Sequence, residues 1–556
     1  MRTYLPLYIL LLFSVSVFAQ NKKKIIIHHS DYSDINEAEI PDAIMLRGNI
    51  SAEHDGVLIN CNKAYFFEKE NYIKLFGDVA MNQGDTIHLK SRYAEYNGVN
   101  GFAYATGNVV LTSPDSKLET DTLHFDRNEN LIYYNSFGKI TNEGNILTSQ
   151  AGKYNLNEKK FQFLNAVTIT TDQGTVVKSN HLDFYEVPQH SYVFGPSTIT
   201  NENNYIYTEN GFYDVKQDIG KMVKNSHILY DDRRIQGDSM YYDKHRDFSS
   251  ATNNVKVIDT INKTIVKGHY AEVYKERDSM FVTKKALISA LTEENDSVHL
   301  HAKRILVTGK TDQRVIRAYD NARIFKTEMS GKSDSINWSQ KEGLTQLIGR
   351  PVLWNGDSQL TGEVIHLIND PITEQLDSLK VLNNAFVIQV DTLSTGYNQV
   401  KGANMYGKFK DNKLYEIDLI KNSEIIYYMY NDLNEFIGIN KGICSQINLQ
   451  LENNKIETAT LMIAPKSEIY PEGELPENAQ KLKDFNWRGE ERILTLEAIF
   501  PDSELELERE ALKNSKKQQR EAEKPIEIQE ETLHNKPGKN AFIKKEVKKT
   551  PLKEVK

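Results

Sequence analysis

Short runs of alternating apolar and polar residues fill most of the chain. In one run Leu123 and Phe125 lie on either side of a polar residue, and such alternation places every second side chain on one face of a β-sheet. The runs are rich in Val, Ile, Thr, Tyr and Phe, which favour strands, and turn formers such as those at 97–98 separate them. Residues 40–465 show no convincing apolar period of 3.6 residues. The pattern therefore predicts an all-β fold.

The strands recur at a nearly fixed spacing. A small residue, a polar residue and a valine open a strand at Gly77-Asp78-Val79, and the same pattern returns 30 residues later at Gly107-Asn108-Val109. A large apolar residue marks the second strand of each unit every 27 to 35 residues, at Leu123, Tyr154, Leu182, Tyr213, Met240, Tyr270, Ile305, Ile336 and Ile365. A period of this size is typical of repeat architectures, and it predicts roughly a dozen copies of one strand-turn-strand unit.

Such a unit of two strands cannot bury its apolar face alone. Stacked units can fold the growing sheet over on itself, so that both inner faces share one apolar interior. The sequence therefore predicts an elongated fold whose interior is either a filled core or an apolar groove. A filled core would suit a scaffold, whereas a long apolar groove would suit a lipid chain.

Composition narrows the function. The net charge of −9 argues against a nucleic-acid binder, which would carry a basic surface. Residues 1–19 hold a single Arg, an apolar run and a terminal Ala19, which together predict a cleaved secretory signal peptide. Cys61 and Cys444 are the two cysteines, and many repeats separate them. We expect no disulfide between them because stacked repeats contact only their neighbours.

Candidate chemistry is sparse, and the sequence predicts no catalytic residues, no metal site and no cofactor. His299 and His301 alternate on one face of a strand and could ligate a metal. Two imidazoles on the solvent face of a strand are the commoner arrangement, which we expect here. Asp-Ser pairs such as Asp238-Ser239 recur at turns and could form calcium sites. Capping of the turn backbone is the simpler explanation.

Several of these motifs resemble the OstA-like β-jellyroll family. Its members include LptA-type lipopolysaccharide-transport proteins, the LptC periplasmic domain and the N-terminal domain of LptD. The resemblance rests on Lys63-Ala64-Tyr65, Gly77-Asp78-Val79, Asp85-Thr86-Ile87, Tyr93-Ala94-Glu95-Tyr96, Gly107-Asn108-Val109 and Asp121-Thr122-Leu123. It is clearest over residues 40–200 and recurs more weakly to residue 465. It implies an elongated, repeat-built open β-jellyroll (a β-taco) made of two consecutive OstA-like segments.

The predicted organisation follows from this resemblance and from changes in composition. The rhythm of the strands is less regular after residue 200, and prolines and polar residues replace it after residue 465. We predict a signal peptide at 1–19, a leader at 20–40, OstA-like domain 1 at 41–200, OstA-like repeats of domain 2 at 201–465, a C-terminal extension at 466–500 and a charged helical or disordered tail at 501–556.

The resemblance implies binding and transport rather than catalysis. Members of the family accept the acyl chains of lipid A inside the jellyroll and join end to end through edge strands, which is β-augmentation. Carried over by position, the interior-facing candidates for lipid binding are Val79, Met81, Ile87, Val109, Leu111, Leu123, Phe125, Ile140, Ile169, Leu182 and Phe184. The chain departs from the single-domain members in its length and its charged tail.

The sequence thus predicts a non-enzymatic periplasmic protein that carries lipopolysaccharide to the outer membrane and assists its assembly. Its expected partners are lipopolysaccharide and other Lpt components, with outer-membrane association through those partners and no nucleic acid. Two alternatives stay open. A β-repeat scaffold or surface adhesin would have a filled interior and bind no lipid, and a β-solenoid enzyme acting on glycans would gather acidic residues in one groove.

Overall fold

The computed structural model describes most of the chain. It covers residues 24–514 apart from 143, 201, 203, 215, 231–232, 292–295, 311–312, 371–372, 374, 412, 453–454, 508 and 511–512. The predicted signal peptide and most of the predicted charged tail lie outside the described residues.

The chain divides into two compact units, residues 1–500 and residues 501–556. In the second unit, helix is described at residues 502–507, 509–510 and 513–514. Among the described residues, no helix is long and apolar enough to cross a membrane.

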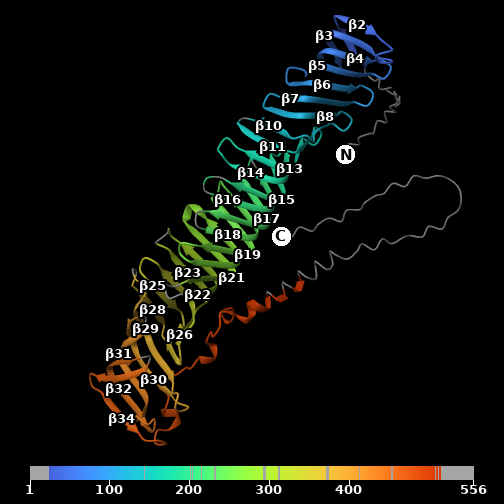
Figure 1. The fold of residues 1–556 in the computed structure, drawn as a ribbon. Coiled ribbons are helices and arrows are strands. Elements are labelled where there is room, and N and C mark those ends of the chain that lie inside the picture. The colour runs from blue at the N-terminus through green and yellow to red at the C-terminus, as the bar shows by residue number, and fades with distance from the viewer. Residues whose placement is uncertain are drawn as a thin grey trace, which may run out of the picture. The chain divides into compact units, whose positions relative to one another are not determined.

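The first unit is built almost entirely from antiparallel strands, which follow one another along a single sheet (Figure 1). Its first strands are β1 (Ile26–His29), β2 (Tyr32–Ile35), β3 (Ile44–His54), β4 (Val57–Phe67), β5 (Tyr72–Gln83), β6 (Ile87–Asn97), β7 (Phe102–Thr112), β8 (Ser116–Asp126), β9 (Leu131–Tyr134), β10 (Gly138–Asn142), β11 (Asn145–Ser149), β12 (Ala151–Asn155), β13 (Lys160–Thr170), β14 (Val176–Tyr185), β15 (His190–Thr200), β16 (Asn204–Asp214) and β17 (Ile219–Tyr230). The sheet continues past residue 200 through the pairing of β15 with β16.

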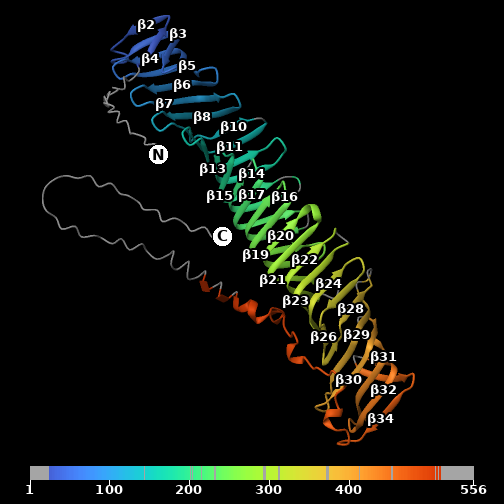
Figure 2. The same ribbon diagram turned by 180° about the vertical axis from the view of Figure 1, so that it is seen from behind.

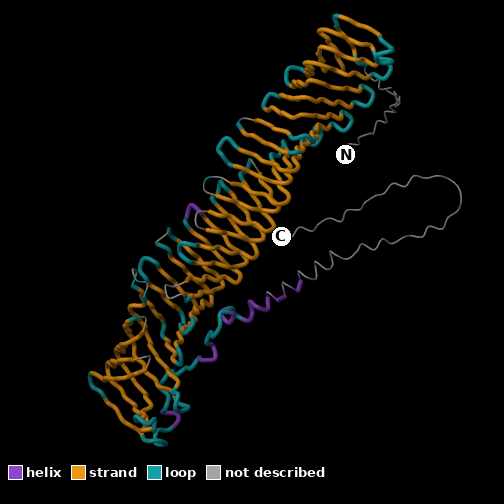
Figure 3. The backbone as a smooth tube through the Cα atoms, in the orientation of Figure 1, coloured by secondary structure: helices purple, strands orange, loops and turns teal. Residues whose placement is uncertain are grey.

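The later strands are β18 (Arg233–Asp243), β19 (Phe248–Asp259), β20 (Thr264–Tyr274), β21 (Ser279–Leu291), β22 (Ser297–Thr308), β23 (Val315–Lys326), β24 (Met329–Ser339), β25 (Leu344–Ile348), β26 (Val352–Asn355), β27 (Ser358–Thr361), β28 (Val364–Asn369), β29 (Leu376–Val390), β30 (Tyr397–Lys410), β31 (Lys413–Tyr430), β32 (Phe436–Glu452), β33 (Lys455–Met462) and β34 (Lys466–Tyr470). Short 3-10 helices are η1 (Lys275–Arg277), η2 (Glu477–Ala479), η3 (Gly489–Glu491) and η4 (Glu497–Ile499). The predicted all-β fold class is confirmed (Figure 3).

Each long strand is bent near its middle. Between β5 and β6 the pairing shifts between Phe76 and Val79, where Gly77 and Asp78 have φ of +71° and +48°. Two consecutive residues of positive φ create a β-bulge, which bends the strand and re-aims its side chains. Similar shifts recur in neighbouring pairs, so the bulges align into a crease and each strand contributes to two facing walls.

The expectation that Gly77 and Gly107 open strands is therefore wrong. Gly77 lies inside β5 and Gly107 inside β7, both at the crease. The physical reason is that a crease bulge and a hairpin turn both require positive φ, which Gly, Asn and Asp adopt most readily. The repeat signature was real, but it marks the middle of a strand.

The hairpin turns lie along the two free edges of the folded sheet, which we call the first and second rim. The first rim contains the turn between β19 and β20, together with every second turn before and after it along the chain. The second rim contains the turns in between, such as the one between β22 and β23. In this description β9–β10, β11–β12, β25–β26 and β27–β28 each count as one bent strand. The gap between the two rims is the mouth of the fold.

A ladder of small polar side chains follows the crease. Ser91 donates a hydrogen bond to the carbonyl oxygen of Tyr93 at 3.0 Å. The thiols of Cys61 and Cys444 make the same contact two residues ahead, at 3.4 and 3.1 Å, and burial raises the pKa of Cys61 to about 11. The two cysteines thus replace hydroxyl residues of the ladder. Its other members with this bond are Thr120, Ser149, Ser179, Thr208 and Ser333.

The interior of the first section, from β1 to β9, is filled by packed side chains. Phe66 and Tyr96 contribute buried aromatic rings to its cluster. The mouth of this section is also closed, because the Tyr96 hydroxyl shares a hydrogen bond of 2.8 Å with the Nδ1 atom of His54 on the opposite rim. An ion pair between Asp55 and Arg127 joins the same two rims.

Residues 475–500, here called the strap, follow the last strand and run back along the outside of one wall (Figures 1 and 2). Leu482 packs with Ile426 of β31, and Ile499 packs with Leu287 of β21. The sequence neighbours of these strand residues belong to the interior cluster, so alternation places the strap on the outer face. It covers an apolar stripe from β32 to β21.

His301 lies beneath the strap. It is fully buried, its Nδ1 atom donates to the carbonyl oxygen of Ala286 at 2.8 Å, and its ring centroid lies 4.9 Å from that of Phe500. Burial lowers the pKa of His301 to about 4. The expectation that His299 and His301 share a solvent-exposed face is wrong for His301, because the strap covers that face. In the part of the chain that the structure describes, no group of three His, Cys, Asp or Glu side chains could hold a metal ion.

Candidate functional site

Beyond the filled first section, the two walls enclose a large cavity. Its volume is about 3500 Å³, and its lining extends from Asn145 to Leu451. Typical small-molecule pockets measure about 300–1,000 Å³, so this cavity would hold a much larger ligand. The lining comes from strand after strand of the same sheet, and the cavity is therefore long as well as large.

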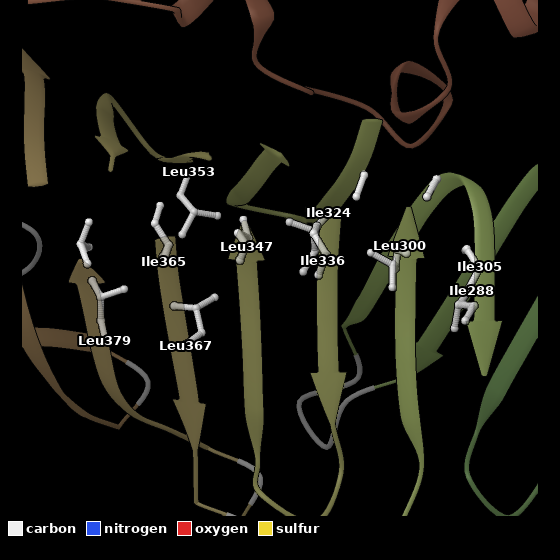
Figure 4. Packing of buried hydrophobic residues seen from close by; sticks show 14 of the residues in the cluster. Ile288, Leu300, Ile305, Ile324, Ile336, Leu347, Leu353, Ile365, Leu367 and Leu379 are labelled. Atoms are coloured by element: carbon white, nitrogen blue, oxygen red, sulfur yellow. The ribbon is translucent and has the colours of Figure 1, made fainter. Parts of the chain in front are cut away.

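Apolar side chains at alternate strand positions form the walls of the cavity. On neighbouring strands, Ile235 of β18 pairs with Val257 of β19, and both face inward. Figure 4 shows the same arrangement further along, where Ile288, Leu300 and Ile324 point into the fold from the successive strands β21, β22 and β23. Because each strand adds one or two such residues, the wall is continuously apolar along the cavity.

The buried interior side chains of this section differ in type from those of the first. The buried members of the cluster from Met240 to Leu449 are aliphatic residues, methionine, alanine and one cysteine, and none of those described is aromatic. Alanines at the crease such as Ala286, Ala302 and Ala322 fill little space. The first section instead contains rings such as Phe66 in the corresponding space.

Charged residues gather where the walls reach the mouth. Among the described lining residues, ten are Lys or Arg and seven are Asp or Glu, which gives the lining a net charge of +3. The whole chain carries −9. The charged lining at the mouth therefore favours an anion although the whole chain is acidic, and the apolar walls below it favour a hydrocarbon chain.

The predicted lipid-binding residues of the first section do not reach this cavity. Val79, Val109 and Leu123 are buried in the filled interior, and Met81 and Leu111 pack against it. Their inward orientation agrees with the alternation from which they were selected. The remaining predicted residues of this section are Ile87 and Phe125, which lie near strand ends. Ile87 is 40% exposed and Phe125 is half-buried.

The other predicted residues lie at the start of the hollow section. Ile140, Ile169, Leu182 and Phe184 belong to one apolar cluster, and of these Ile169 and Leu182 line the cavity. That lipid contacts any of the eleven residues stays a prediction.

Sequence reasoning missed most of the lining, because it carried positions over only as far as residue 184. Met222, Ile235 and Val257 all line the cavity and follow the same inward alternation. The repeat marker itself offered a usable signal. Met240 and Ile336, which the 27-to-35-residue spacing had singled out, are both in the lining.

Comparison with known proteins shows that the N-terminal part of the chain matches a family model. Residues 22–179 match the family model described as OstA-like protein. Among solved structures, one similar chain is titled the crystal structure of LptH, the LptA homologous periplasmic component of the conserved lipopolysaccharide transport device from Pseudomonas aeruginosa. It is 15% identical, the match covers 26% of this chain and 95% of that chain, and the TM-score is 0.20. No curated protein matches the chain.

Proposed function

Because residues 22–179 match the OstA-like family model, we propose that the chain binds the acyl chains of lipopolysaccharide or a related amphiphile. In this proposal it works in the periplasm, without catalysis, and helps to carry the amphiphile to the outer membrane. The predicted signal peptide would deliver it there.

The observation that carries the proposal is the long apolar cavity with a charged mouth. An amphiphile has the matching division, because its hydrocarbon chains gain free energy on leaving water while its headgroup loses free energy if it is buried. Transfer of apolar surface is worth about 25 cal/mol per Å², so several acyl chains in one cavity would provide strong binding. Contact between acyl chains and the apolar walls requires no specific interactions, which suits a cargo that moves along the cavity.

The two ends of the sheet support a proposal about partners. At one end β2 exposes Tyr32 and Ile35, and at the other Ile463 and Ile469 are exposed beside β33 and in β34. Unpaired edge strands can pair with strands of another chain. We therefore include end-to-end association with other Lpt components in the proposal. Replacing Tyr32 and Ile35 by lysine should weaken such association in sedimentation measurements while leaving lipid binding intact.

Site-specific photo-crosslinking tests lipid binding directly. A photoreactive residue at Ile235 or Val257 would face the cavity, and one at Arg234 would face outward from the same strand as Ile235. A third position, Val109, lies in the filled first section. With lipopolysaccharide as the probe, we expect adducts at Ile235 and Val257 and none at Arg234 or Val109.

Three results would overturn the proposal or change it. The absence of adducts at all positions in a folded protein would favour the scaffold alternative. Equal adducts at Arg234 and Ile235 would indicate adsorption on the surface rather than an occupied cavity. Adducts confined to Val109 would place the lipid in the first section and move the site.

A further inference from the structure

Two arginines from opposite rims meet at one aspartate over the cavity. Asp259 ends β19 on the first rim, and Arg233 begins β18 directly beside it. Arg314 lies just before β23 on the second rim. The Arg233 Nε and Arg314 Nη1 atoms each donate to Asp259 Oδ2 at 3.3 Å. The pair between Asp259 and Arg314 therefore crosses the mouth, and all three side chains line the cavity.

Asp259 is the fixed member of this triad. It is 7% exposed and accepts hydrogen bonds from the backbone N–H of Asn262 at 3.0 Å and from its Nδ2 at 2.9 Å. Burial alone would raise the pKa of Asp259, but these hydrogen bonds and the charges of Arg233 and Arg314 outweigh it and hold the pKa below its usual value. The carboxylate is therefore charged, and it holds both guanidinium groups at the mouth.

The triad carries one more positive than negative charge. A guanidinium has five N–H donors in a planar fork that matches phosphate as well as carboxylate, and each arginine donates one hydrogen bond to Asp259 here. Lys263, in the turn after Asp259, and Lys341 also line the cavity. An anion that approaches the mouth from solvent would meet these cations on both rims.

We propose that Arg233 and Arg314 bind the phosphate group of an amphiphile's headgroup, while its acyl chains occupy the cavity below. The inference rests on the proposed function, because a headgroup reaches this point only if its chains enter between the rims. Asp259 orients the arginines before the phosphate arrives and competes with it for their N–H donors. The triad therefore favours a phosphorylated lipid as the ligand at the mouth.

A purely structural role for the triad makes a different prediction from a phosphate site. If the ion pairs served only to hold the rims together, Asp259→Asn would not change the preference for a phosphorylated ligand. If the arginines bind phosphate, Asp259→Asn removes a competing charge and should raise that preference. Asparagine keeps the oxygen that accepts the hydrogen bond from the backbone of residue 262, so the turn should survive.

The experiment compares phosphatidic acid with diacylglycerol of the same acyl chains, delivered to the full-length mature chain from the same cyclodextrin carrier. In the wild type we expect tighter binding of phosphatidic acid, by at least about tenfold if one charge-assisted hydrogen bond per arginine forms. Arg233→Gln with Arg314→Gln should abolish the difference between the two lipids. The matched control is Arg304→Gln with Arg350→Gln, which removes two arginines that pair with Asp320 and Asp334 away from the cavity lining.

Each outcome has one reading. If the wild type binds both lipids but the mouth variant retains the preference, the inference is wrong and the proposed function stands. If the wild type binds neither lipid, the proposed function fails first. If inorganic phosphate alone binds as tightly as phosphatidic acid and is lost in the mouth variant, the site serves free phosphate and the headgroup assignment is overturned. A preference lost equally in the control variant would show a general charge effect and would also reject the site.

Discussion

Two buried glutamines hold the strap on the outer wall, and their removal should release it. The Gln399 side chain accepts from the backbone N–H of Leu482 at 2.8 Å and donates to a strap carbonyl oxygen at 2.8 Å. The Gln359 side chain accepts from the N–H of Arg488 at 2.6 Å and donates to another strap carbonyl at 2.8 Å. Both glutamines are 1% exposed. Each carboxamide therefore pairs with the strap as a neighbouring strand would.

The size of the effect follows from these four hydrogen bonds. Gln399→Ala leaves one N–H and one carbonyl of the strap without their partner, and a buried unsatisfied group costs about 1–3 kcal/mol. Water that enters the space left by the side chain would recover part of that cost. We therefore expect each substitution to lower the local opening free energy of the strap by about 2 kcal/mol, or roughly thirtyfold in the opening constant.

Hydrogen exchange of individual amides measures this opening directly. The amide of Leu482 should exchange roughly thirtyfold faster in Gln399→Ala, and that of Arg488 should do so in Gln359→Ala. The control is Gln162→Ala, which removes a side-chain amide that bonds to Asp183, remote from the strap. If both strap amides exchange at wild-type rates in both variants, the glutamines do not hold the strap and apolar packing alone accounts for its position.

Three further predictions test the interior of the fold. Cys61→Ser should change the free energy of unfolding by under about 1 kcal/mol, because serine makes the same hydrogen bond at the crease in other copies of the repeat. Urea titration would measure this change, and a loss of several kcal/mol would contradict the equivalence of the ladder positions. Ile336, 1% exposed in the interior, should cost about 2–5 kcal/mol when replaced by alanine, while Asn337→Ala on the other face should cost far less in the same titration. The pKa of His301 is lowered to about 4 in the folded chain from an ordinary value near 6.5, so the unfolded chain takes up a proton on His301 at a higher pH than the folded chain does. The free energy of unfolding should therefore fall as the pH drops from about 6.5 to 4. His301→Gln should remove that part of the pH dependence, and an unchanged slope of Tm against pH would refute the assignment.

The strands and turns of the fold could be predicted because they depend on local sequence. Alternation fixes which face of a strand is apolar, and Asn-Gly pairs fix tight turns, so the all-β class followed without tertiary information. The crease could not be separated from a turn in this way. Gly77 and Asp78 adopt positive φ in a bulge, and the sequence records that need for positive φ without recording whether the chain continues or reverses.

The strap and the cavity depend on contacts between distant residues, and so they escaped prediction. Gln399 and Leu482 are 83 residues apart in the sequence, and nothing near either residue indicates the other. The strap also lacks strand alternation because it consists of turns and short 3-10 helices. The cross-mouth pair of Asp259 and Arg314 is similar, since 55 residues separate two ordinary charged residues at turns. Inward-facing positions were predictable, whereas the space between the walls depends on the sum of many side-chain volumes.

The contrast between the filled and hollow sections limits where an acyl chain can bind. In the first section a chain would have to displace rings such as Phe66 and Tyr96, which are buried in the interior. An aromatic side chain buries about 150–250 Å², so exposing one ring would cost roughly 4–6 kcal/mol. Displacing it would also break the hydrogen bond between Tyr96 and His54 that closes the mouth. In the hollow section the chain enters space that is already present. The amphiphile should therefore bind between Asn145 and Leu451, and the first section should act as a rigid end to which that cavity is attached.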